Sequence, residues 1–180
     1  MRIEIKTTGS VSARWRDVAK NATERTLDFM NFDTAPSVHL VAERYAVPTP
    51  RGSQIVAGGY DPKSQEVVVS ISWIEHRAAQ LPPPNIEDFD VGEKLMTFII
   101  AHEVCHYVQD RLKCLPPPDA SVGLFVTDLD RYDNLPHERE ANVVAWRMAP
   151  GLRTPTMAGP DMIQYLQRDP KLRGTGFPSK

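Results

Sequence analysis

The clearest chemical pattern in the chain is His102-Glu103-Val104-Cys105-His106, in which a histidine and a glutamate are followed by a second histidine. It lies between apolar residues 95–101 and 107–108, and this setting favours a helix. Residues four positions apart share one helix face, so both imidazoles can reach a single zinc ion. The glutamate between them can take a proton from a water on that ion. The pattern therefore predicts metal-assisted hydrolysis, most simply of peptide bonds.

A catalytic zinc site usually has three protein ligands, so a third ligand must come from another part of the chain. A third histidine in the longer H-E-x-x-H-x-x-G-x-x-H pattern is excluded, because Gln109 and Leu112 occupy those positions. A glutamate on a later helix is the other common solution. The segment that begins at Pro136 offers two, Glu138 and Glu140, and His137 is a rival ligand or a helper near the site.

Helical spacing favours Glu138 as the third ligand. Glu138 shares one face with Ala141, Asn142 and Ala145, and the small alanines would let this helix pack closely on the motif helix. Asn142 is then well placed to bind the outer nitrogen of a zinc-bound imidazole. Glu140 shares its face with bulkier residues and suits the site less well. The predicted ligands are therefore His102, His106 and Glu138, and the predicted metal is zinc, with manganese and cobalt as alternatives.

Taken together, the two motifs resemble those of the glutamate-zincin (gluzincin) metallopeptidases, in which H-E-x-x-H pairs with a downstream E-x-x-A-[DN]. Residues 138–142 match the second pattern, and the run from Glu140 to Pro150 is similar to the ImmA/IrrE-type peptidases of bacteria and their mobile elements. The chain has Cys105 where those proteins commonly have glycine, and Val144-Ala145 in place of Phe-Ala. The resemblance covers residues 95–150. It implies a zincin-like fold and an intracellular peptidase, with phage-type repressors as one substrate class.

The periodicity along the chain predicts an α+β fold, in which strands and helices alternate first and helices follow. In zincins a sheet precedes the motif helix and its edge strand lies beside the substrate, a place that the resemblance gives to Glu66–Ile74. Asp90 and Glu93 predict the start of the motif helix, and Pro136 the start of the next one. We expect strands over residues 2–6, 37–43, 54–60 and 66–74, helices from 12 to 30, through the motif, over 136–149 and over 160–167, and a loop over 119–134.

Composition and charge indicate an ordinary globular protein. The chain has 180 residues, 41% of them hydrophobic, and a net charge of −2 with scattered basic residues. These values favour one domain over residues 1–168 with a flexible tail over 169–180, and they argue against nucleic acid as a partner. We expect a protein or peptide substrate. The chain shows no signal-peptide core and no membrane-length apolar run, and Cys105 and Cys114 are spaced unfavourably for a disulfide. The expected location is the cytoplasm.

Several functional questions stay open at this point. The group that would stabilise an oxyanion has four candidates, namely Tyr132, His137, Arg147 and Tyr165. A non-enzymatic module in which zinc stabilises the fold or a binding surface is an alternative to a peptidase. A third interpretation is a peptidase of low intrinsic activity, with the loop over residues 115–135 covering its cleft.

Overall fold

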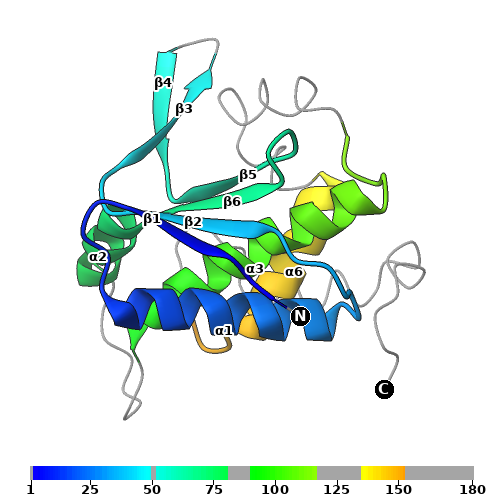
Figure 1. Ribbon diagram of the computed structural model, residues 1–180, viewed down its shortest axis with the longest axis horizontal. Helices are drawn as coiled ribbons and strands as arrows, with labels where there is room; N and C mark the ends of the chain where they lie inside the picture. The colour runs from blue at the N-terminus through cyan, green and yellow to red at the C-terminus, as the bar shows by residue number, and fades with distance from the viewer. Residues whose placement is uncertain (1, 50–51, 81–89, 117–134, 153–180) are drawn as a thin grey trace.

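The computed structural model describes residues 2–49, 52–80, 90–116 and 135–152. These residues form an α+β structure in which one face of a small sheet lies on a layer of helices (Figure 1). The predicted α+β class is therefore confirmed. The elements are β1 (Ile5–Thr8), α1 (Ala13–Phe29), β2 (Ser37–Val41), β3 (Tyr45–Thr49), β4 (Gly52–Val56), β5 (Gly58–Asp61), β6 (Glu66–Ser70), α2 (Ile71–Gln80), α3 (Val91–Arg111) and α6 (Pro136–Met148).

The main sheet has the order β1-β2-β6-β5, with β1, β2 and β6 parallel and β5 antiparallel to β6. Its two faces differ because strand side chains alternate. Val38 and Leu40 pair in register with Val67 and Val69, and all four are buried against the helices. The opposite face carries polar residues such as His39, which is partly exposed. One apolar face and one solvated face are typical of a sheet that helices cover on one side only.

Helix α3 is the centre of the fold. It packs against α1 and α6 as well as the sheet, and its apolar residues are buried all round the helix. Asp90 begins it as predicted, because the side-chain carboxylate accepts a hydrogen bond from the backbone N–H of Glu93 at 2.9 Å. Arg14 of α1 binds both of these carboxylates. The helix that carries the motif is therefore held at its start and along its length.

Helix α2 is a correction to the sequence prediction. The alternation of Val67, Val69, Ile71 and Trp73 predicts a strand to residue 74, but β6 ends at Ser70 and Ile71 begins a helix. The Ser70 hydroxyl explains the change, since it accepts a hydrogen bond from the Trp73 backbone N–H at 3.3 Å, as an N-cap does. Because β6 also lies between β2 and β5, it is not the edge strand that the zincin resemblance predicts.

The segment before β5 is a second correction. The sequence predicts a loop around residues 48–52, but β3 and β4 form an antiparallel hairpin there, which projects from the sheet (Figure 1). The predicted strand over 54–60 is divided between β4 and β5, and β5 is the edge of the main sheet. Gly58 allows β5 to approach α3 closely. A Cβ atom there would lie 2.8 Å from both Ile99 Cγ2 and the Val68 carbonyl oxygen.

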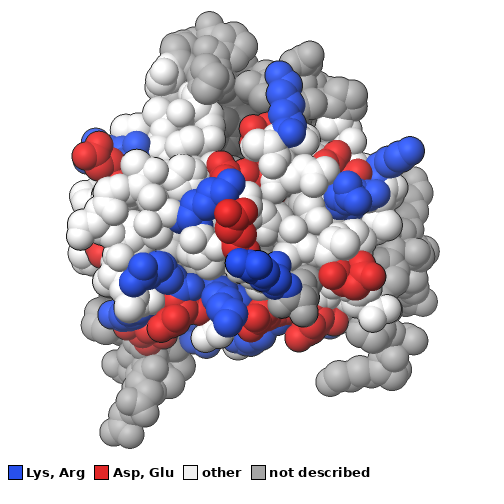
Figure 2. Space-filling model, viewed as in Figure 1, with Lys and Arg blue, Asp and Glu red and all other residues white. Residues whose placement is uncertain are grey.

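Three predicted segments lie outside the described residues: the loop over 119–134, the helix over 160–167 and the tail over 169–180. Within the described ranges, no helix combines the length and the apolar character that crossing a membrane requires. Basic and acidic side chains are interspersed on the face drawn in Figure 2, so the described part of that face has no extended basic patch.

Candidate metal centre

Two helices bring the predicted ligands together. His102, Glu103 and His106 lie on α3, and Glu138 lies in the first turn of α6, just after Pro136. The helices pack closely because Ala141 and Ala145 are fully buried where α6 meets its neighbours. Glu138 and Asn142 are buried on α6 as well, with 3% and 8% of their surface exposed. The predicted buried face of this helix is therefore confirmed.

The three candidate ligand atoms form a small triangle. The Nε2 atoms of His102 and His106 are 3.0 Å apart, and Glu138 Oε2 lies 3.2 Å from the first and 3.4 Å from the second. Donor atoms about 2.0–2.1 Å from a tetrahedral zinc ion are separated from one another by about 3.4 Å. The described residues hold one such group of three metal-binding side chains, and it is this one.

The outer nitrogens of the two imidazoles fix their protonation. His102 Nδ1 lies 3.0 Å from Asn142 Oδ1, and His106 Nδ1 lies 2.8 Å from Gln109 Oε1. An amide oxygen only accepts hydrogen bonds, so each Nδ1 carries a proton, and a ring that holds no second proton presents a lone pair at Nε2. Two lone pairs 3.0 Å apart repel each other unless a cation, either a proton or a metal ion, lies between them. The predicted bond from Asn142 to an imidazole is confirmed.

The carboxylate of Glu138 has an unsatisfied oxygen. Its Oε2 atom is buried and has no hydrogen-bond partner among the described residues. Burial disfavours the charged form, but the nearby imidazoles of His102, His106 and His137 outweigh this effect and lower the pKa of Glu138. Burial also disfavours a charged His106, yet Glu138 raises the pKa of that imidazole to about 9. A buried negative charge beside two imidazoles fits a divalent cation.

Glu103 lies between the cluster and the sheet edge. The backbone N–H of Tyr60 on β5 lies near its carboxylate and favours the charged form. Burial raises the pKa of Glu103, the nearby Glu138 adds to the rise, and the two motif histidines oppose it. The predicted general base is therefore a partly buried carboxylate that lies next to the candidate ligands and near the edge strand.

Gln109 is a site residue that the sequence analysis missed. Its side chain is buried between α3 and α6, and its amide nitrogen donates to the carbonyl oxygen of His137 at 3.0 Å and to Glu140 Oε2 at 2.9 Å. Glu140, the rival ligand, is thus bound to Gln109. The available signal was spacing, because residues three apart on a helix are neighbours and Gln109 follows His106 by three positions.

The remaining predicted site residues are only partly placed. His137 Nε2 lies 3.4 Å from Glu138 Oε1, the oxygen that does not face the other two histidines. The Arg147 guanidinium lies over the Phe29 ring at 5.6 Å. Tyr132 and Tyr165 lie outside the described residues. Among the four oxyanion candidates, His137 is therefore the described residue that contacts the cluster.

The two cysteines form no disulfide, as their spacing predicts. Both are free, and Cys114 is exposed. Cys105 is fully buried and packs against Ala141 and Val144 of α6 as a small apolar residue. Burial raises the pKa of its thiol well above the usual value, so it stays protonated. Cys105 therefore contributes packing between the two helices.

Tyr45 of β3 is a second neighbour of the site that the sequence did not indicate. A Cβ atom at Gly59, the residue before Tyr60, would lie 3.7 Å from the Tyr45 ring. Burial and the charges of Asp61 and Glu103 raise the pKa of Tyr45, so its hydroxyl keeps its proton. The base of the hairpin therefore lies near the candidate general base.

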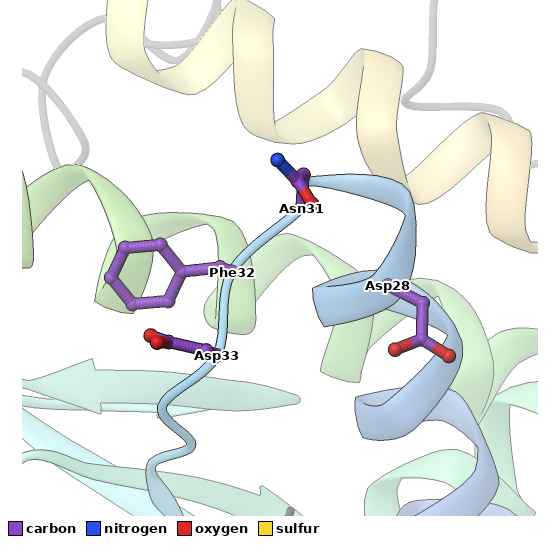
Figure 3. Close-up of a pocket in the computed structure, with 4 residues that line it drawn as sticks. All are labelled: Asp28, Asn31, Phe32 and Asp33. Carbon is purple, nitrogen blue, oxygen red and sulfur yellow. The ribbon is translucent and has the colours of Figure 1, made fainter.

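A separate hollow lies where α1 leads into β2. Asp28, Asn31, Phe32 and Asp33 line it (Figure 3). None of the predicted site residues belongs to this lining. The ring of Phe32 packs edge-on against Tyr107 of α3, with ring centroids 6.0 Å apart. The hollow therefore adjoins the motif helix but contributes nothing to the cluster of two histidines and a glutamate.

Searches of family models, curated proteins and solved structures gave no match to this chain.

Proposed function

We propose that this protein is a zinc metallopeptidase of the gluzincin type, similar to the ImmA/IrrE-type enzymes. The observation that carries the proposal is the triangle of His102, His106 and Glu138, with edges of 3.0, 3.2 and 3.4 Å, beside the Glu103 carboxylate. These three side chains would hold the ion. A zinc ion with an open coordination position lowers the pKa of a coordinated water to about 7 and polarises a carbonyl group.

Glu103 supplies the proton transfer in this proposal. Its carboxylate accepts a proton from the attacking water and then delivers that proton to the departing amine. The raised pKa of Glu103 supports the role, because a carboxyl group nearer to neutral pH exchanges protons more readily. The Tyr60 backbone N–H lies near the carboxylate and favours its charged form, which is the form that accepts a proton.

The edge strand β5 is the proposed binding strand for an extended peptide. Because backbone groups alternate along an antiparallel strand, Gly58 and Tyr60 direct their N–H and C=O groups away from β6. The Tyr60 N–H lies near Glu103, so this edge is close to the proposed general base. A peptide that adds to β5 would bring its carbonyl groups past that residue.

The alternative of a purely structural zinc site gains little support. A structural zinc normally has four protein ligands, and neither His137 nor Cys105 supplies the fourth. His137 contacts the other oxygen of Glu138, and Cys105 packs against α6 in an apolar cluster. Three converging ligand atoms and an adjacent carboxylate favour a catalytic arrangement.

The first test is the metal content of purified protein, compared between wild type, Glu138→Ala and Glu140→Ala. We expect one zinc ion per wild-type chain and a strong loss in Glu138→Ala, with Glu140→Ala retaining the metal under zinc excess. A wild-type protein that takes up no zinc even when the metal is supplied would overturn the proposal.

The second test is peptide-bond hydrolysis on a mixture of unfolded proteins and peptide libraries, read by mass spectrometry. Glu103→Gln keeps the size of the side chain and removes the base, so we expect zinc to stay bound while cleavage falls by roughly 10²–10⁴-fold. Equal cleavage by Glu103→Gln and wild type would show that the activity comes from another group or from a contaminant.

A further inference from the structure

The outer partners of the two imidazoles are arranged differently. His102 binds Asn142, which lies on α6 itself. His106 binds Gln109 on its own helix, and only Gln109 reaches α6. On its outer side, His106 is therefore connected from Nδ1 to the glutamate-bearing helix through one buried amide, which is 3% exposed.

The amide of Gln109 can adopt one orientation in this setting. Its oxygen accepts the proton of His106 Nδ1, and its two N–H groups face acceptors, the His137 carbonyl oxygen and Glu140 Oε2. Turning the amide over would set N–H against N–H at the imidazole and oxygen against oxygen at α6. The two acceptors on α6 thus fix which atom meets the histidine.

We propose that Gln109 is the positioning residue for His106 and that Glu140 acts on the metal centre only through Gln109. This inference rests on the metal site proposed above and deepens it. Glu140 then has a defined role without being a ligand, because its carboxylate orients an amide that in turn orients a ligand. Two observations support this chain of contacts. Glu140 Oε2 lies 2.9 Å from the Gln109 amide nitrogen, and that nitrogen also donates to the His137 carbonyl oxygen, so both of its N–H groups have acceptors.

The inference makes a quantitative prediction about zinc affinity, measured by competition with a chelator of known affinity. Gln109→Leu removes the acceptor for His106 and should weaken zinc binding by about 10–100-fold. Glu140→Ala should cause a smaller loss in the same direction. The double variant should match Gln109→Leu alone, since Glu140 has nothing left to orient.

A spectroscopic measurement separates positioning from general damage to the fold. Cobalt(II) in place of zinc reports ligand geometry through its visible absorption bands. We expect the bands to shift in Gln109→Leu and, less strongly, in Glu140→Ala, while circular dichroism stays that of wild type. Glu66→Ala is the matched control, because it removes a carboxylate that also lies beside a histidine, but on the open sheet face.

Two results would overturn the inference while leaving the proposed function intact. One is a wild-type zinc affinity and cobalt spectrum in Gln109→Leu. The other is a double variant in which Glu140→Ala weakens zinc binding as much as it does alone, in addition to the loss caused by Gln109→Leu. That result would show a direct action of Glu140 on the metal centre. Should Gln109→Leu fail to fold, Glu140→Ala alone decides, and an unchanged cobalt spectrum there contradicts the inference. A wild-type protein that binds no zinc would instead overturn the proposed function itself.

Discussion

Glu66 and Glu138 both lie beside histidines, and their surroundings differ. Glu66 lies on the solvated face of the sheet, where Oε1 accepts a hydrogen bond from Lys6 at 2.9 Å and Oε2 lies 3.4 Å from His39 Nδ1. Glu138 lies between α3 and α6, where Oε2 has no hydrogen-bond partner among the described residues and lies 3.2 and 3.4 Å from two imidazole nitrogens. Glu66 therefore has hydrogen-bond partners for its carboxylate, whereas one oxygen of Glu138 has none among the described residues.

The difference shows that convergence and burial, more than residue type, set the candidate metal centre apart from a surface ion pair. On the sheet face each group meets a partner that can satisfy it, and His39 Nε2 also lies 2.7 Å from the Thr8 hydroxyl. In the interior, the possible ligand atoms of three side chains point at one place, and Asn142 and Gln109 hold the two imidazoles there. Without a cation this arrangement raises the free energy of the folded protein, and a bound cation would lower it.

The largest expected effect comes from neutralising Glu138 and Glu66 in turn. Zinc at about 1,000 times its dissociation constant would stabilise the wild-type protein by about 4 kcal/mol. Glu138→Gln should abolish most of this stabilisation, because it replaces a ligand, whereas Glu66→Gln should leave it unchanged. Thermal unfolding with and without zinc, after treatment with a chelator, measures both. Equal zinc-dependent shifts in the two variants would contradict the assignment of Glu138.

Asn142 contacts one of the two candidate histidine ligands in the buried cluster. Its oxygen accepts the Nδ1 proton of His102 at 3.0 Å and so keeps the lone pair of that ring on Nε2. Asn142→Ala should weaken zinc binding by about 10–100-fold. Val143→Ala, one residue further along α6, removes a side chain that is not part of the cluster and serves as the control. Similar zinc affinities for the two variants would argue that the orientation of His102 does not depend on Asn142.

Most of the candidate site could be read from the sequence, because it depends on spacing within helices. The start of α3 at Asp90, the start of α6 at Pro136 and the position of Asn142 four residues after Glu138 are local patterns. The same spacing argument applies to Gln109, because it follows His106 by three residues. Spacing alone did not reveal it, since its role appears only when α6 supplies acceptors for its amide nitrogen.

The sheet was harder to predict, and α2 and β5 explain why. Alternating apolar residues up to Trp73 fit a strand, and only the hydrogen bond that the Ser70 hydroxyl makes to the next turn reveals the helix. The edge position of β5 results from pairing with β6, a contact between strands that single-strand patterns do not specify. The position of the Tyr60 N–H near Glu103 could not be predicted for the same reason.

A glycine pair tests the contact between the sheet edge and the motif helix. A methyl group at Gly58 would meet Ile99 and the Val68 carbonyl oxygen at 2.8 Å, so β5 or α3 must shift. We expect Gly58→Ala to lower the free energy of unfolding by about 1–3 kcal/mol. Gly59→Ala is the control, because its new methyl group would meet only the Tyr45 ring, at an ordinary 3.7 Å. Chemical denaturation of both variants measures the difference, and equal stabilities would show that the close approach of β5 to α3 is easily relaxed.

The smallest effect belongs to Glu66 on the open face. Burial disfavours its charge, but Lys6 and His39 together outweigh this and lower the pKa of Glu66 from its ordinary value of 4.5. A carboxylate with a lowered pKa in the folded state stabilises the protein above the unfolded value, and the contribution is lost as the pH falls through the folded value. Glu66→Gln should therefore be slightly less stable than wild type at neutral pH and equal to it in acid. Because both partners are solvent-accessible, high salt should shrink the difference at neutral pH. Urea unfolding at both pH values and two salt concentrations checks this, and a difference that grows in acid would show that Glu66 is stabilised by something other than its neighbouring cations.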